Sequence, residues 1–92
     1  MSYKALGYTQ VTGLSASTGL SIPAGTTLIL VTPETQAVRW RDDGTAPTGS
    51  VGYPLPVGAE LRYIAEQMAA LRFIEQLPSA KLNVVFYSGK AS

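Results

Sequence analysis

The sequence contains no cysteine and no histidine, and it has few charged residues. Without cysteine the chain has no disulfide, no thiolate nucleophile and no thiolate metal ligand, and this absence fits a reducing compartment. Without histidine it has no imidazole base. Charged residues make up 14% of the 92 residues, where an ordinary soluble domain carries roughly 25%. These absences exclude the catalytic and metal chemistries that depend on thiolate or imidazole groups.

The charge that is present does not favour a polyanionic partner. The net charge is +1, and the basic residues are scattered along the chain at positions 4, 39, 41, 62, 72, 81 and 90. Nucleic-acid binding normally needs a clustered basic face. The longest aliphatic run covers 28–31, far below the ~20 residues that span a bilayer. The N-terminus lacks the apolar stretch of a signal peptide. We therefore expect no nucleic acid, no membrane and synthesis in the cytoplasm.

The combination of small size and low charge predicts a protein partner. A domain of this length buries only roughly 60% of the surface of its unfolded chain, so much apolar surface stays near the exterior. Charge normally keeps such a surface soluble and monomeric. We therefore expect a homo-oligomer or a component of an assembly. In the alternative interpretation, the serines and threonines between positions 9 and 50 supply the polar surface.

Nine glycines and six prolines divide the chain into short segments. Apolar alternation and short aliphatic runs predict strands over 3–12, 27–32, 36–41, 51–55 and 81–87. Pro33 is expected to end the second of these, and Pro54 and Pro56 restrict the fourth to a sheet edge. Asp42, Asp43 and Gly44 predict a chain reversal.

The segment 59–77 fits two structures. Leu61, Ile64, Met68 and Leu71 share one face of a helix, whereas the residues at each end favour strands. We favour a strand over 60–64, a helical turn over 65–69 and a strand over 70–76.

Seven or eight short strands indicate an all-β fold. We expect a single domain over 1–92, a small β-sandwich or jelly-roll-like barrel with at most one short helical turn and a frayed tail at 88–92. The predicted core residues are Leu28, Leu30, Val38, Trp40, Phe73, Leu82, Val84 and Phe86.

No group of residues has the pattern of an active site. Asp42 and Asp43 supply only a fragment of the roughly six oxygen ligands that a hard cation needs. Glu60 and Glu66 would need a sugar cleft between them to act as a glycosidase pair, and the chain is too short to build one. The serines and threonines have no histidine to activate them, and the glycines do not form a phosphate-binding pattern. We therefore expect no enzyme activity, no cofactor and no metal.

Trp40, between Arg39 and Arg41, is the most distinctive local feature. Trp40 suits the core of a sandwich, with the two guanidinium groups solvated or paired with Asp42, Asp43 or Glu34. Alternatively, the arginines anchor an interface, because arginine and aromatic side chains are enriched at binding hot spots. The tyrosines are amphipathic and suit either a core edge or a binding face. The candidate interface residues are Arg39, Arg41, Tyr53, Arg62 and Tyr63.

Four stretches together resemble a known group of proteins. They are VRWRDDGTAPT at 38–48, VGYPL at 51–55 followed by Gly58, LRFIE at 71–75 and AKLNVVFY at 80–87. This pattern, which covers about 38–87, resembles small structural proteins encoded by tailed bacteriophages. The resemblance implies a β-sandwich or jelly-roll virion component without catalysis.

Three functions follow as expectations. The first is a capsid decoration or cement protein, a trimer or other symmetric oligomer that binds across major capsid subunits in the virion. The second is a structural protein of the head–tail neck, the tail or a fibre attachment. The third, from a different class, is a carbohydrate-binding module that uses Trp40, Tyr53 or Tyr63.

Overall fold

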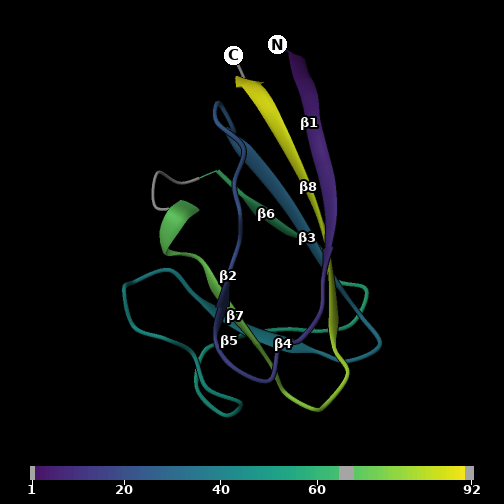
Figure 1. The fold of residues 1–92 in the computed structure, drawn as a ribbon, viewed down its shortest axis with the longest axis vertical. Helices are drawn as coiled ribbons and strands as arrows, with labels where there is room; N and C mark the ends of the chain where they lie inside the picture. Colours follow the sequence, from purple (N-terminus) through teal and green to yellow (C-terminus); the bar gives the residue numbers. More distant parts are fainter. Residues whose placement is uncertain (1, 65–67, 91–92) are drawn as a thin grey trace.

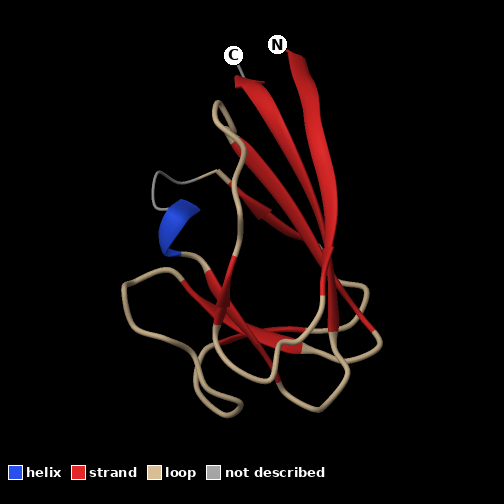
Figure 2. Ribbon diagram, in the orientation of Figure 1, coloured by secondary structure: helices blue, strands red, loops and turns tan. Residues whose placement is uncertain are grey.

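A computed structural model of the chain describes residues 2–64 and 68–90. The described residues form eight strands and one 3-10 turn, which confirms the all-β expectation (Figures 1 and 2). The strands are β1 (Ser2–Val11), β2 (Thr18–Gly19), β3 (Leu28–Glu34), β4 (Val38–Arg41), β5 (Tyr53–Leu55), β6 (Leu61–Tyr63), β7 (Arg72–Glu75) and β8 (Lys81–Lys90). The 3-10 turn η1 covers Met68–Ala70.

The strands form two antiparallel sheets of four strands each. One sheet has the order β1-β8-β3-β6 and the other has the order β2-β7-β4-β5. β8 lies between β1 and β3, with Val84 opposite Thr9 on one side and opposite Val31 on the other. β1 is the outermost strand of its sheet in Figure 1. The fold is thus a small β-sandwich.

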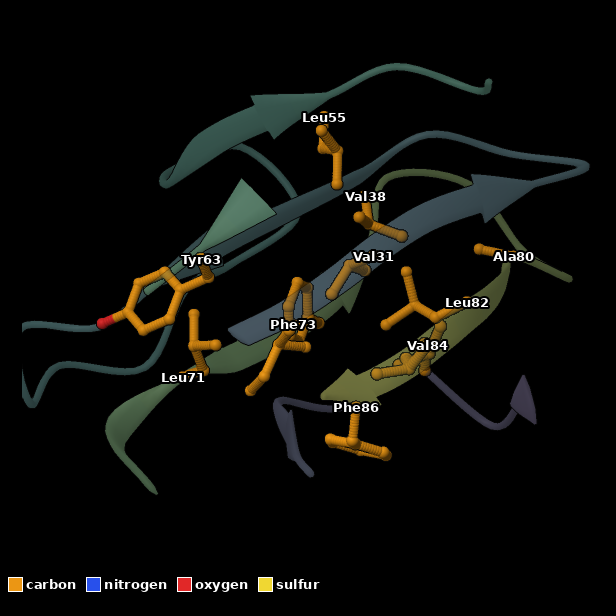
Figure 3. Packing of buried hydrophobic residues seen from close by; sticks show 12 residues of the cluster. Val31, Val38, Leu55, Tyr63, Leu71, Phe73, Ala80, Leu82, Val84 and Phe86 are labelled. Carbon is orange, nitrogen blue, oxygen red and sulfur yellow. The ribbon is translucent and has the colours of Figure 1, made fainter. Parts of the chain in front are cut away.

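The core lies between the two sheets (Figure 3). Alternate residues of β8 point inward, as the sequence predicts for Leu82, Val84 and Phe86. Phe73 and Val38 enter from the opposite sheet and are fully buried. The other buried members of the cluster are Leu14, Ile29, Val31, Leu55, Tyr63, Leu71 and Ala80.

Three predicted core residues are not members of the central buried cluster. Leu30 is half-buried on the outer face of β3, because the inward side chains of this strand are those of Ile29 and Val31. A run of four aliphatic residues has no alternation, so its pattern cannot show which face points inward. Leu28 is buried, but it is not part of the central cluster. Trp40 is half-buried and packs against the core rather than inside it.

Two strands extend beyond their predicted ends. β3 continues through Pro33, which is buried opposite Leu82 of β8. The expectation that Pro33 ends the strand is therefore wrong. β6 pairs with Ile29 to Val31 only, and beyond it the carbonyl of Pro33 accepts a hydrogen bond from the N–H of Gly58 at 3.1 Å. The N and C=O of one strand residue point to the same side, so the missing N–H of Pro33 is directed away from β8 and removes no bond to it. β8 continues to Lys90 by pairing with β1, so 88–90 are strand and not a frayed tail, and 91–92 lie outside the described residues.

The ambiguous segment is strand, turn and strand. β6 and β7 flank η1, as favoured from the sequence, and η1 covers Met68–Ala70 of the described residues. Residues 65–67 lie outside the described residues. The reversal after β4 is present as well, with Gly44 in the left-handed region at φ 88°. β5 is an edge strand, as its prolines predict. Thr18 and Gly19 form the two-residue strand β2, which pairs with β7.

Candidate functional site

The candidate site is built around Trp40 on β4. Its ring contacts Tyr53 of β5, with the ring centroids 5.5 Å apart at 45°, and Tyr63 of β6, with the centroids 6.2 Å apart at 84°. The Tyr63 side chain is buried, whereas Tyr53 is 67% exposed. The three rings therefore form one aromatic cluster that runs from the core to the surface. Tilted and edge-on geometries of this kind are the favourable ones for aromatic pairs.

Arg39 holds the loop that joins β4 to β5. Its Nε donates to the carbonyl of Gly49 at 3.3 Å, and its Nη1 donates to the carbonyl of Gly52 at 2.9 Å. Within the same loop, Thr48 Oγ1 accepts a hydrogen bond from the N–H of Val51 at 2.9 Å. The Arg39 guanidinium is thus used inside the chain to fix the loop that presents Tyr53.

Gly52 allows this loop to lie close to β4. Its φ is 145°, a backbone region that side chains rarely adopt. A Cβ at this position would lie 3.1 Å from Cβ of Arg39, 3.1 Å from Cβ of Pro47 and 3.4 Å from the carbonyl oxygen of Trp40. Position 52 therefore requires glycine both for its backbone conformation and for space.

Arg41 forms an ion pair with Asp43. Its Nε donates to Oδ1 of Asp43 at 3.0 Å and its Nη2 donates to Oδ2 at 2.5 Å. The hydrogen bonds from Arg41 lower the pKa of Asp43 to about 2 and raise the pKa of Arg41. Both side chains are accessible to solvent, so water screens the pair and it contributes little to stability. Of the acidic residues considered from the sequence, Asp43 is thus the one that pairs with Arg41.

Arg72 of β7 lies directly opposite Arg41 in the sheet. Like charges at such positions repel each other. Arg72 donates through Nε to Ser17 Oγ and through Nη2 to the carbonyl of Ser17, both at 3.0 Å. Each guanidinium thus has its own hydrogen-bond partner, and Arg72 ties the segment before β2 to β7.

Tyr63 is a buried structural residue, which corrects its assignment to the interface. Its hydroxyl donates to Oδ2 of Asp42 at 2.6 Å. Burial, followed by the bond to the Asp42 carboxylate, raises the pKa of Tyr63 to about 12. The sequence did not reveal this because Tyr63 ends a short strand whose inward face is not evident from three residues.

The interface candidates do not form one group. Four of them lie around Trp40: Arg39, Arg41, Tyr53 and Tyr63. Arg62 is exposed on the outer face of β6, where it pairs with Leu30 of β3.

A hollow of about 380 Å³ lies beside the cluster and is lined by Trp40, Arg41, Asp42, Asp43, Gly52 and Tyr53. Trp40 Nε1 is buried and has no hydrogen-bond partner among the described residues. The hollow therefore combines an exposed aromatic ring with carboxylate and guanidinium groups.

The charged residues are unevenly distributed along the chain, which the total composition does not show. No Asp, Glu, Lys or Arg occurs between Lys4 and Glu34, or between Asp43 and Glu60. The first stretch covers most of β1, all of β2 and most of β3. The second, which we call the neutral β5 segment (44–59), exposes Val51 (54%), Tyr53 (67%) and Val57 (53%). The uncharged residues are thus concentrated in two stretches of the chain, and the charge is not spread evenly along it.

Two further observations concern the described residues. They contain no cluster of three or more acidic, histidine or cysteine side chains placed to hold a metal ion. Within the same part of the chain, no helix has the length and apolar character needed to cross a bilayer.

Comparison with family models, curated proteins and solved structures finds no match to this chain.

We expect Gly52→Ala to destabilise the protein by about 1–3 kcal/mol, because alanine would be held in a strained backbone region and against two side chains. Urea unfolding followed by circular dichroism measures the loss. Gly49→Ala is the matched control in the same loop, since the nearest atom to its Cβ would be Glu75 O at an ordinary 3.8 Å. Equal stabilities of the two variants would contradict this account of the loop.

The Tyr63–Asp42 bond predicts a loss of stability at alkaline pH. The pKa of Tyr63 lies above its ordinary value of 10.0 in the folded protein, so its contribution is complete below pH 10 and falls as the pH rises towards about 12. We expect Tyr63→Phe to remove this part of the pH dependence, whereas Tyr53→Phe, at an exposed ring, retains it. Urea unfolding at pH 8, 10 and 11 makes the comparison, and parallel declines in all three proteins would refute it.

Proposed function

We propose that the protein is a non-enzymatic structural component of a virion, and specifically a capsid decoration protein that binds across major capsid subunits. The observation that carries the proposal is the neutral β5 segment, which exposes three large apolar side chains without a charged residue among them. An exposed apolar surface of this kind favours contact with protein. The resemblance of 38–87 to phage structural proteins supports the same role.

The geometry of the segment favours contact through side chains. β5 is an edge strand, but Pro54 lies within it and Pro56 follows it, so the edge is poorly suited to pairing with another strand. Arg39 and Gly52 hold the preceding loop against β4. Val51, Tyr53 and Val57 are therefore presented on a fixed support, which reduces the conformational entropy lost on binding. Burying them across a subunit boundary would stabilise the shell by mass action.

Purified particles of the phage that encodes the chain test the proposal. We expect hundreds of copies per particle on a quantitative gel, and a count of tens or fewer would favour the neck, tail or fibre position. Val57→Asp should lose binding to particles, because it places a charge on the neutral β5 segment. Leu77→Asp is the matched control, since Leu77 is 59% exposed in another loop. Absence of the protein from particles would overturn the proposal.

A second candidate function is carbohydrate binding at the hollow beside Trp40. Tyr53 exposes its ring there next to Arg41, Asp42 and Asp43, and a sugar can stack on an aromatic face while its hydroxyls bond to charged groups. The burial of Tyr63 leaves Tyr53 as the exposed ring of the cluster, which makes this site smaller than the sequence expectation.

Fluorescence distinguishes this candidate, because Trp40 is the single tryptophan of the chain. Carbohydrate binding predicts a saturable change in Trp40 emission on titration with host-surface glycans, and predicts that Tyr53→Ala abolishes it. Tyr8→Ala is the control, since Tyr8 is exposed on β1. An emission spectrum that does not change with any glycan would eliminate this function.

A further inference from the structure

The edges of the two sheets differ in how well they are protected. Among the described residues, β6 and β2 are edge strands of three and two residues, and β5 has three residues including Pro54. β1, in contrast, is an edge strand of ten residues. Proteins normally prevent edge pairing with short strands, proline, charges or bulges. Three edges of this sandwich are short or contain proline, whereas β1 is long and is protected only near its start, by Lys4 and a bulge between Ala5 and Gly7.

Most of the length of β1 contains no proline, charge or bulge that would prevent pairing with another strand. It contains no proline, and its one charged residue, Lys4, precedes the bulge between Ala5 and Gly7. The part from Gly7 to Val11 pairs regularly with β8 and carries no charge. Tyrosine, threonine and valine are residues that favour strands. This part of β1 therefore presents a regular and neutral backbone edge.

A hollow of about 510 Å³ lies along the same part of β1. It is lined by the consecutive residues 7–12, by Phe86, and by four residues of the segment 19–23, which are Gly19, Leu20, Ser21 and Pro23. Side chains of a strand alternate between its faces, so a lining of consecutive residues means that the backbone itself borders the hollow. Thr9 is exposed there, although its partner Val84 on β8 is buried.

We propose that β1 pairs with β1 of a second copy, antiparallel and around a two-fold axis, so that the two four-stranded sheets become one continuous sheet. A two-fold interface must be complementary to itself. Antiparallel pairing of 7–11 with its own copy brings no like charges opposite each other, because this part contains none. Lys4 lies to one side of it, so the two copies of Lys4 are at opposite ends of the paired region.

The absence of charge on this edge also favours a second copy of the chain as the partner. The edge and the segment 19–23 both belong to the stretch without charge between Lys4 and Glu34. The Arg72 guanidinium lies beside Gly19, but Ser17 holds it through two hydrogen bonds. A partner that binds through charged groups would find no complementary charge on 7–11 itself. A second copy needs none, because backbone hydrogen bonds supply the attraction. Self-association through β1 does not depend on whether the protein binds to a particle.

Light scattering after size-exclusion chromatography tests the proposal on the purified full chain. We expect a mass twice the 9.7 kDa of one chain. Thr9→Lys should halve this mass, because it places a charge on the paired edge of both copies. Thr45→Lys, the same exchange at an exposed position after β4, should remain dimeric. Circular dichroism verifies that each variant is folded.

Disulfide trapping provides a second test that does not require a destabilising charge. The chain contains no cysteine, so Thr9→Cys introduces a single thiol near the expected axis. With diamide as the oxidant, this variant should form a covalent dimer much faster than Thr45→Cys. A monomeric or trimeric wild type, a dimeric Thr9→Lys or equal trapping of the two cysteines would overturn the proposal. Loss of particle binding alone would instead count against the decoration function.

Discussion

The contact between the inward faces of the two sheets is the constraint on which the other features depend. Each sheet buries one face against the other, and the fully buried Phe73, Val38 and Leu82 occupy the space between them. Their burial supplies the main favourable free energy of so small a domain. It also fixes which way every strand faces, because side chains alternate along a strand. With Val38 inward, the side chains of Arg39 and Arg41 are directed outward and are available for the contacts that hold the next loop and turn.

This alternation explains how far the sequence could predict the structure. Inward and outward positions are evident on β8, where Leu82, Val84 and Phe86 alternate with Asn83 and Val85, and the all-β fold follows from several such strands. The same reasoning could not orient β3, because its aliphatic run is equally apolar on both faces. Of the site, the sequence indicated Trp40 and its arginines but not the burial of Tyr63. Tyr63 is buried by contacts with residues distant in the sequence, and its hydroxyl bonds to Asp42, twenty-one positions away.

The charges near Trp40 are engaged locally. Arg41 pairs with Asp43, Arg39 binds loop carbonyls, and Arg72 binds Ser17. Interactions of this kind fix loops and turns without requiring a partner molecule. The contacts with partners that we propose therefore lie in the stretches of the chain without charge, 5–33 and 44–59. This division could not be read from total composition, which gives the number of charges but not their places on the fold.

The two neutral surfaces differ in the contacts that they allow. The neutral β5 segment contains prolines, so it interacts through side chains, whereas β1 offers a free row of backbone N–H and C=O groups. A molecule with two long open edges in one sheet could pair without limit and form fibres. In this sheet the edge opposite β1 is β6, which has three residues. The proposed pairing through β1 would therefore stop at two copies, and it would not use the β5 segments.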